Sequence, residues 1–437
     1  MVQDTGCYIR LEYANTRMNR VNKDTRNYIL MFFDPVTYVA AMVFISINAV
    51  IPNFLNELGA SAFQISFASA LCGIGPFLSQ PLFAQTAMGK PLKSISFARI
   101  LYVQRFLFLL YVLFISLINR YFPSLSVTAF LTFWGIFNIF VGCYSPFFMS
   151  VISKVIPGNQ RGRLSGFANA AGNILALGSA FLIGVILKKF LFPFNYTLIF
   201  GIGTLLLILN AMTFALIEEE PDETKKKAIN YFKYIREIPH ALRTNKGYAA
   251  TVMGNSFLVI SNVALAFYTL AAIRNFDAGP EQIALFTGIG VLVNIFGSMV
   301  FGVIGDWAGH RYVLLISAFF SALASVLVSS IHSLITIYIG FALSSLSTGG
   351  YMLSGGMNII NHSPKEQLPL YVSMNTMITL TASSTVTLLA GAIIDTFSFT
   401  PLFVFTALCG VISTLVFYGS DKTKDIVRSN SEDQLLS

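Results

Sequence analysis

The chain has 437 residues, of which 55% are hydrophobic and only 11% carry a charge. A soluble protein carries charge on about 25% of its residues, so this composition excludes a soluble globular fold and indicates a protein surrounded by lipid. The formal net charge of +8 is explained by basic loops on one face of a membrane, and nucleic-acid binding is not expected.

Twelve apolar runs follow a polar and basic N-terminal segment, which lacks the short apolar core of a cleavable signal peptide. Each run is close to the ~20 residues that a membrane helix needs, and is far longer than a strand of a membrane barrel. The expected spans are 35–56, 62–83, 97–119, 125–149, 164–187, 194–217, 248–273, 283–305, 312–331, 334–358, 370–394 and 399–418. The sequence therefore predicts an all-α membrane protein with twelve transmembrane helices.

The basic residues are distributed unequally between the two faces that these spans define. With the N-terminus in the cytosol, cytosolic segments hold 23 of the 28 basic residues and the opposite face holds four. Cytosolic loops of membrane proteins carry such an excess of lysine and arginine. We therefore expect both termini in the cytosol and a location in the plasma or inner membrane.

The longest loop, residues 218–247, divides the spans into six plus six. An even number of spans fits the charge bias, because a missed span would reverse the assignment of every later loop. We expect a cytosolic N-terminal segment at 1–34, a six-helix bundle at 35–217, a cytosolic linker at 218–247, a second six-helix bundle at 248–419 and a cytosolic tail at 420–437.

A short polar loop between spans eight and nine reads GVIGDWAGHR, and its distinctive residues are Gly302, Asp306, Gly309 and Arg311. The glycines let two helix ends approach closely. We expect Asp306 to lie near the N-terminus of span eleven, where a helix dipole favours an anion. We expect Arg311 to pair with a carboxylate or with carbonyl groups at a span end. A plain solvated turn is the alternative.

The two halves repeat this pattern weakly. The loop at 81–90 corresponds to the one at 302–311, with Gln85 in place of the aspartate and with Gly89 and Lys90 retained. After span four, Pro157 aligns with Pro364 after span ten, so the two pairs of segments are offset by 221 and 207 residues. Internal symmetry of this kind is frequent in membrane transporters.

These loops resemble the signature loops of the major facilitator superfamily, and so does the stretch after span four with Arg161, Gly162 and Arg163. The resemblance covers roughly residues 30 to 420. It implies two six-helix bundles and a secondary, non-ATP-driven transporter of a small organic solute that works by alternating access. The alternative is a non-transporting membrane protein: a sensor, a lipid-binding scaffold or a membrane enzyme.

In that family, spans one, four, seven and ten line the central path. Polar side chains on these spans are therefore candidates for a substrate cavity, since they can replace the water shell of a solute. The candidates are Asn48, Asn138, Tyr144, Asn262, Ser347 and Tyr351. Hydrogen bonding between helices would use the same residues. The many hydroxyl groups of span eleven indicate tight helix packing.

Two charged residues lie in or beside spans. Arg105 is a candidate functional charge because it lies inside span three. Since it is about eight residues from the cytosolic end, we expect either a structural role or a side chain extended toward the interface. Asp34 is expected at the start of span one, although the apolar run can begin at Tyr28 and bury it. With no carboxylate expected at the midplane, we anticipate facilitated diffusion, or coupling to a proton or cation through Asp34.

The sequence contains no metal-ligand spacing among its four histidines and four cysteines, and no phosphate-binding loop. No catalytic residue, metal site or cofactor is therefore expected. The expected partners are a small-molecule substrate, membrane lipid and a coupling proton or cation, and we expect a monomer. The apolar, aromatic-rich spans favour efflux of an amphipathic compound, whereas the asparagines favour uptake of a polar metabolite.

Overall fold

The computed structural model describes residues 5–221, 239–360, 362–363 and 368–419, with side chains in the first helix described from Lys23. The described part is helical and contains no strand. Twelve helical segments are long and apolar enough to cross a membrane. The number of spans and the all-α class expected from the sequence are thus confirmed, while much of the linker after Pro221 lies outside the described residues.

The first half contains six spans made from nine elements. They are α1 (Thr5–Phe44), α2 (Val50–Glu57), α3 (Ala62–Gly89), α4 (Lys93–Tyr121), the 3-10 turn η1 (Pro123–Leu125), α5 (Ser126–Val141), α6 (Tyr144–Val155), α7 (Gly158–Lys189) and α8 (Phe194–Leu216). The apolar segment of the first span begins at Lys23 rather than at residue 35, because the helix continues through the basic segment before it.

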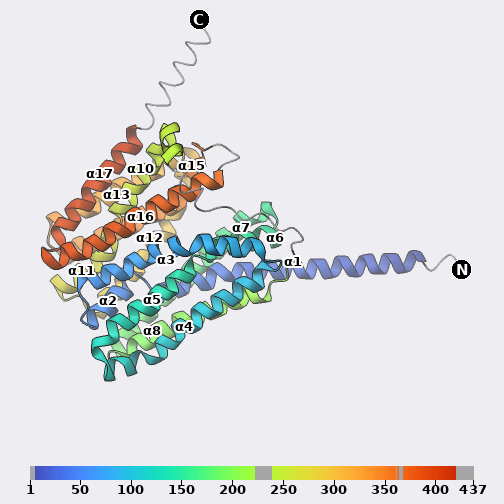
Figure 1. Cartoon of the computed structure of the whole chain (residues 1–437), viewed down its shortest axis with the longest axis horizontal. Coiled ribbons are helices and arrows are strands. Elements are labelled where there is room, and N and C mark those ends of the chain that lie inside the picture. Colours follow the sequence, from blue (N-terminus) through green and yellow to red (C-terminus); the bar gives the residue numbers. More distant parts are fainter. Residues whose placement is uncertain (1–4, 222–238, 361, 364–367, 420–437) are drawn as a thin grey trace, which may run out of the picture.

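The second half also contains six spans. Its elements are α10 (Lys246–Ser261), α11 (Ala264–Phe276), α12 (Pro280–Trp307), α13 (His310–Ser330), α14 (Leu334–Ser354), α15 (Met357–Ile360), α16 (Leu368–Thr396) and α17 (Phe399–Gly419). Each half forms its own bundle, and Figure 1 shows the blue-to-green half below the yellow-to-red half.

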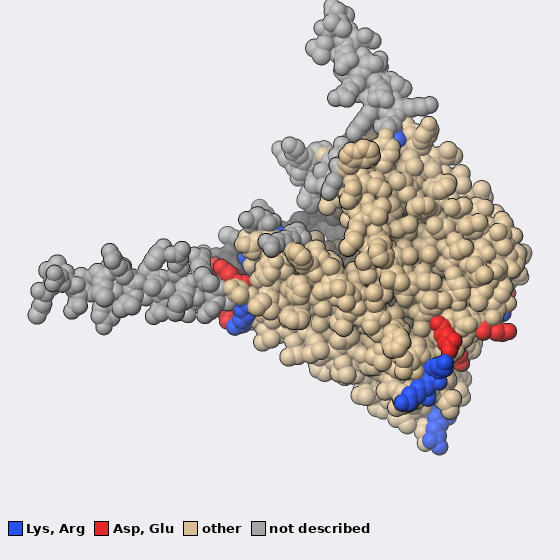
Figure 2. Space-filling view, turned by 180° about the vertical axis from the view of Figure 1, so that it is seen from behind, with Lys and Arg blue, Asp and Glu red and all other residues tan. Residues whose placement is uncertain are grey.

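The two bundles meet along α3 with α16 and along α7 with α12, and α2 also touches α11. They converge at the face that carries the α2–α3 and α16–α17 connections, and they diverge toward the face where the described chain starts and ends (Figure 1). We call these the closed face and the open face. Figure 2 shows a notch in the described surface between the two lobes.

The helix is interrupted in four spans, near the middle of the fourth and seventh and at the end of the apolar segment of the first and tenth. The breaks fall between α1 and α2, α5 and α6, α10 and α11, and α14 and α15, which are the first, fourth, seventh and tenth spans. Irregular backbone at membrane depth is tolerated where protein or a water-filled cavity surrounds it. In transporters such interrupted helices mark the substrate site, because they free backbone groups to bind a ligand.

Candidate functional site

Polar contacts between the halves concentrate at the closed face. The Thr269 hydroxyl on α11 donates to the Asn48 carbonyl oxygen at 2.7 Å, at the break between α1 and α2. Arg274 donates from Nη2 to the Ala60 carbonyl oxygen at 3.2 Å. A surface ion pair joins Lys188 to Glu281 at 2.6 Å. These contacts tie the two bundles together on this side.

Asp395 at the end of α16 is the centre of the closed face. Its Oδ1 accepts the backbone N–H of Ala62 at 2.9 Å, and its Oδ2 accepts that of Phe63 at 2.8 Å. These N–H groups belong to the first turn of α3, where backbone donors lack partners within the helix. Arg274 lies 3.8 Å from the same carboxylate. Asp395 therefore caps a helix of the other half with a charge that its dipole favours.

At the open face, the contacts hold each half to itself. Arg26 pairs with Glu218 at 2.6 Å, which joins the start of the first span to the end of the sixth. Arg311 donates to the carbonyl oxygens of Phe417 and Tyr418 at 2.6 and 2.8 Å. The expected contact of Arg311 with span-end carbonyls is thus confirmed.

The remaining switch-loop candidates are only partly described. Gly309 has φ of 99°, a left-handed conformation that glycine adopts freely. Arg161 donates to the Ile156 and Ser153 carbonyl oxygens, both at 2.9 Å, and so caps the end of α6. Nothing within 4 Å would meet a Cβ at Gly302, and Lys90 is exposed. The side chains of Gln85, Arg163 and Asp306, and the surroundings of Gly89 and Gly162, are not among the described features.

The cavity candidates divide into two groups. Asn48 and Asn262 lie at the breaks of the first and seventh spans and are half-buried, and the Asn262 Oδ1 atom is buried without a partner in the described part. Ser347 is fully buried, and its Oγ likewise finds no partner among the described residues. Tyr351 is half-buried and packs against a small apolar cluster around Leu258.

Asn138 belongs to the helix packing rather than to an open path. It is 3% exposed, and its Nδ2 donates to the Trp134 carbonyl oxygen one turn earlier at 2.9 Å. A Cβ at Gly75 of α3 would lie 2.6 Å from the Asn138 carbonyl carbon, so the two backbones are in close contact. This bond lies within α5, so it is not the hydrogen bond between helices that was the alternative for these asparagines.

The main departure from the sequence-based expectations concerns Asp34. It lies well inside the first span, which runs over Lys23–Phe44, and is 0% exposed. Its carboxylate accepts from the Tyr144 hydroxyl at 3.0 Å and from Asn210 Nδ2 at 2.6 Å. Asp34 therefore lies inside the apolar segment and is buried, as an apolar run that begins near Tyr28 would place it, and not at the start of the span.

Arg105 completes this cluster. It is 1% exposed, so its side chain does not reach the interface as expected, and its Nη2 donates to Asn210 Oδ1 at 2.6 Å. Asn210 on α8 thus bridges the carboxylate and the guanidinium. Sequence reasoning missed Asn210, although an amide in the middle of an apolar run was a usable signal. Tyr38 stacks on Tyr144 with ring centroids 5.2 Å apart.

The second half has no charge at the equivalent place. The offset of 221 residues between the two repeated loops also relates Asp34 to Asn255, and the offset of 207 relates Tyr144 to Tyr351. Asn255 is 0% exposed and donates to Asn375 Oδ1 at 3.1 Å. The two halves therefore share a polar position in their first span, but only the N-terminal half has a titratable group there.

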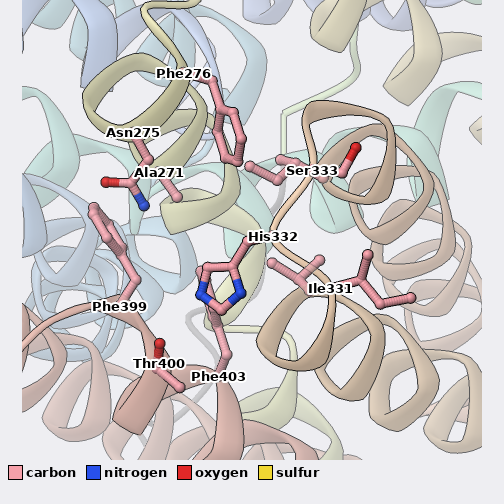
Figure 3. Close-up of a pocket in the computed structure, with 11 residues that line it drawn as sticks. Ala271, Asn275, Phe276, Ile331, His332, Ser333, Phe399, Thr400 and Phe403 are labelled. Carbon is pink, nitrogen blue, oxygen red and sulfur yellow. The ribbon is translucent and has the colours of Figure 1, made fainter.

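A separate small pocket of about 30 Å³ lies at the closed-face end of the C-terminal half (Figure 3). His332, Asn275, Phe399 and Phe403 are among the residues that line it. It has room for little more than water, and its residues all belong to one bundle. A small organic molecule does not fit there.

Comparison with known proteins identifies a protein family and several solved structures with a similar fold. The family model described as Major Facilitator Superfamily matches residues 35–270 and 247–436. No curated protein matches the chain in sequence. Among solved structures, a mutant form of the nucleoside transporter NupG superposes with a TM-score of 0.68 at 11% identity, over 91% of this chain and 99% of that one.

Two further structures have similar folds. A bacterial homologue of the human lysosomal transporter Spinster, described as inward-facing and unoccupied, has a TM-score of 0.65 at 13% identity over 92% of this chain and 97% of that one. A D-xylose-proton symporter has a TM-score of 0.63 at 17% identity over 90% and 95%. At these identities the likeness concerns the fold.

Proposed function

The chain belongs to the Major Facilitator Superfamily and is a secondary transporter, and we propose that it couples transport of a small organic solute to a proton that binds at Asp34. The open face is the cytosolic face, because that assignment places 23 of the 28 basic residues in the cytosol. The described conformation is then inward-facing, with the path to the outside sealed at Asp395 and Thr269.

The observation that carries the proposal is the surroundings of Asp34. A buried carboxylate in a membrane span is costly and marks proton or ion pathways. Here its charged form accepts hydrogen bonds from Tyr144 and Asn210, and Arg105 lies one hydrogen bond further away. A buried carboxyl group with these polar partners is a candidate for a group that gains and loses a proton during a cycle.

The position of Asp34 offers a route from protonation to movement. Tyr144 is the first residue of α6, directly after the break in the fourth span, and its hydroxyl reaches α1 through Asp34. Protonation removes the negative charge, and hydrogen bonds to a neutral acceptor are weaker than those to a charged one. Loading a proton therefore loosens α6 from α1, on two of the four broken spans.

Relatives of this fold support such coupling, since one neighbour is named as a D-xylose-proton symporter. The competing mechanism is uncoupled facilitated diffusion, which needs no titratable residue inside the membrane. Direction and substrate remain to be assigned, with uptake of a polar metabolite and efflux of an amphipathic compound as the two cases to separate.

Reconstituted vesicles test the proposal. Nucleosides, pentoses and amphipathic amines would be screened for flux with and without a pH gradient. We expect one class to be concentrated against its gradient only when a pH gradient is present. Asp34→Asn should abolish concentration but retain counterflow of labelled against unlabelled solute, since exchange needs no net proton movement. Concentrative, pH-driven transport by Asp34→Asn would refute the assignment of the proton site.

A further inference from the structure

Arg105 borders a small cavity inside the N-terminal bundle. Its walls include Tyr38, Gln104, Phe137, Val141, Tyr144 and Leu207, and its volume is about 20 Å³. A water molecule needs roughly 10–15 Å³ on this measure, so the cavity holds one small species. We call it the Arg105 cavity.

The hydrogen-bond donors of Arg105 are incompletely used. Nη2 donates to Asn210, whereas Nε and Nη1 are buried and have no partner in the part of the chain that the structure describes. Those two nitrogens carry three N–H donors. Leaving charged donors unpaired away from water is costly, which indicates that an acceptor occupies this place in the working protein.

In the described part of the chain, no wall atom accepts from Arg105 Nε or Nη1. Gln104 Nε2 donates to the Phe137 carbonyl oxygen at 2.8 Å, and the Tyr144 hydroxyl donates to Asp34. Phe137, Val141 and Leu207 present apolar surface to the cavity. Asp34 reaches Arg105 only through the Asn210 amide. Water can accept a hydrogen bond here, but it brings no negative charge to balance the guanidinium.

We propose that the Arg105 cavity binds one small monovalent anion of the size of chloride. A guanidinium edge also fits a carboxylate, but a cavity for one small species excludes the body of an organic solute. The site is therefore distinct from the path of the transported solute. The proposal rests on the cavity and on the unused donors, and it stands whether or not Asp34 carries the coupled proton.

Thermal unfolding of the purified full-length protein in detergent measures this binding. Tm would be recorded in sodium chloride, sodium bromide and sodium gluconate at equal ionic strength. We expect chloride and bromide to raise Tm saturably by about 2–4 °C relative to gluconate, which is too large for the cavity. Equal Tm values in chloride and gluconate would overturn the proposal.

Substitutions locate the site. Val141→Leu adds a methylene to the cavity wall and leaves Arg105 in place, so it should remove the chloride effect. Val185→Leu, on an exposed surface of α7, is the matched control and should keep it. Arg105→Gln should also remove it, and Val141→Leu keeps the test decisive where that variant does not fold. A chloride shift of unchanged size in Val141→Leu would contradict the assignment.

Asp34→Asn gives an independent readout. It removes the nearest negative charge, so the chloride concentration at half-effect should fall about tenfold. This result is separate from the loss of pH-driven transport predicted for the same variant. In Asp34→Asn, an unchanged half-effect concentration together with the loss of pH-driven transport would therefore refute only the anion site. A tenfold lower half-effect concentration together with retained pH-driven transport would refute only the proton site.

Discussion

Replacing Asp395 with asparagine should shift the transporter from the inward-facing toward the outward-facing state. The carboxylate accepts two charge-assisted hydrogen bonds from the first turn of α3, at 2.9 and 2.8 Å, and lies 3.8 Å from Arg274. The two hydrogen bonds cross between the halves, and the Arg274 ion pair joins two residues of the C-terminal half that contact the other half. We therefore expect all three contacts only while the closed face is closed. The perturbation therefore acts on the balance between the two states.

The size of the effect follows from these contacts. A hydrogen bond to a charged group contributes about 1.5–3 kcal/mol, and asparagine can replace only one of the two with a neutral acceptor. The Arg274 pair adds at most ~1 kcal/mol, because both side chains are about 30% exposed. A loss of about 2 kcal/mol changes the population ratio roughly thirtyfold.

Distance measurements between spin labels on opposite halves would detect this shift. The labels would be attached at Leu191→Cys and Phe397→Cys, after replacement of the native cysteines. Both positions lie at the closed face, where the native side chains are 88% and 78% exposed. We expect a longer-distance population to appear in Asp395→Asn. Glu281→Gln, which breaks an exposed ion pair across the same face, should leave the distribution unchanged. Identical distributions for Asp395→Asn and the parent would refute this account.

Three further predictions concern packing, the switch loop and topology. A Cβ at Gly391 would lie 2.6 Å from the Phe63 Cα on the other half, so Gly391→Ala should destabilise the closed face by about 1–3 kcal/mol. The same distance measurement would detect this change. Gly178→Ala, with no neighbour within 4 Å of the added Cβ, is the control and should leave the distances unchanged. Asp306→Asn should shift the population toward the inward-facing state by up to about tenfold with substrate binding retained, and unchanged cysteine accessibility on both faces would indicate a simple turn residue. Ser429→Cys should resist impermeant reagents applied outside intact cells, and labelling from outside would exclude a cytosolic C-terminus.

The sequence predicts the helical skeleton well because length and apolarity decide it. Twelve runs of sufficient length leave few alternatives, and the glycines and charges of the loops mark the connections. The contact of Arg311 with span-end carbonyls was predictable for the same reason, since a basic residue at a short turn has few other partners.

The buried cluster of Asp34, Asn210 and Arg105 was harder to predict, because the linear sequence does not show which residues on different helices come together. Asp34 lies in the same helix as Lys23 and Arg26, so a span drawn only from a charge-free apolar run starts after it. Asn210 and Asn138 are both amides in the interior of apolar runs, yet Asn210 joins two charges and Asn138 bonds within its own helix. The break between Phe44 and Val50 contains no glycine or proline, and only tertiary packing reveals it.

The difference between Asp34 and its counterpart Asn255 has a quantitative consequence for energy conversion. A transporter with two related halves and a titratable group in only one of them can couple the movement of one proton to each molecule of solute. One proton supplies ~1.4 kcal/mol per pH unit and ~2.3 kcal/mol for each 100 mV of membrane potential. With no membrane potential, a gradient of one pH unit can therefore concentrate a neutral solute about tenfold. Asn255→Asp would be the first step toward a two-proton stoichiometry, which would allow a higher solute concentration ratio for the same pH gradient.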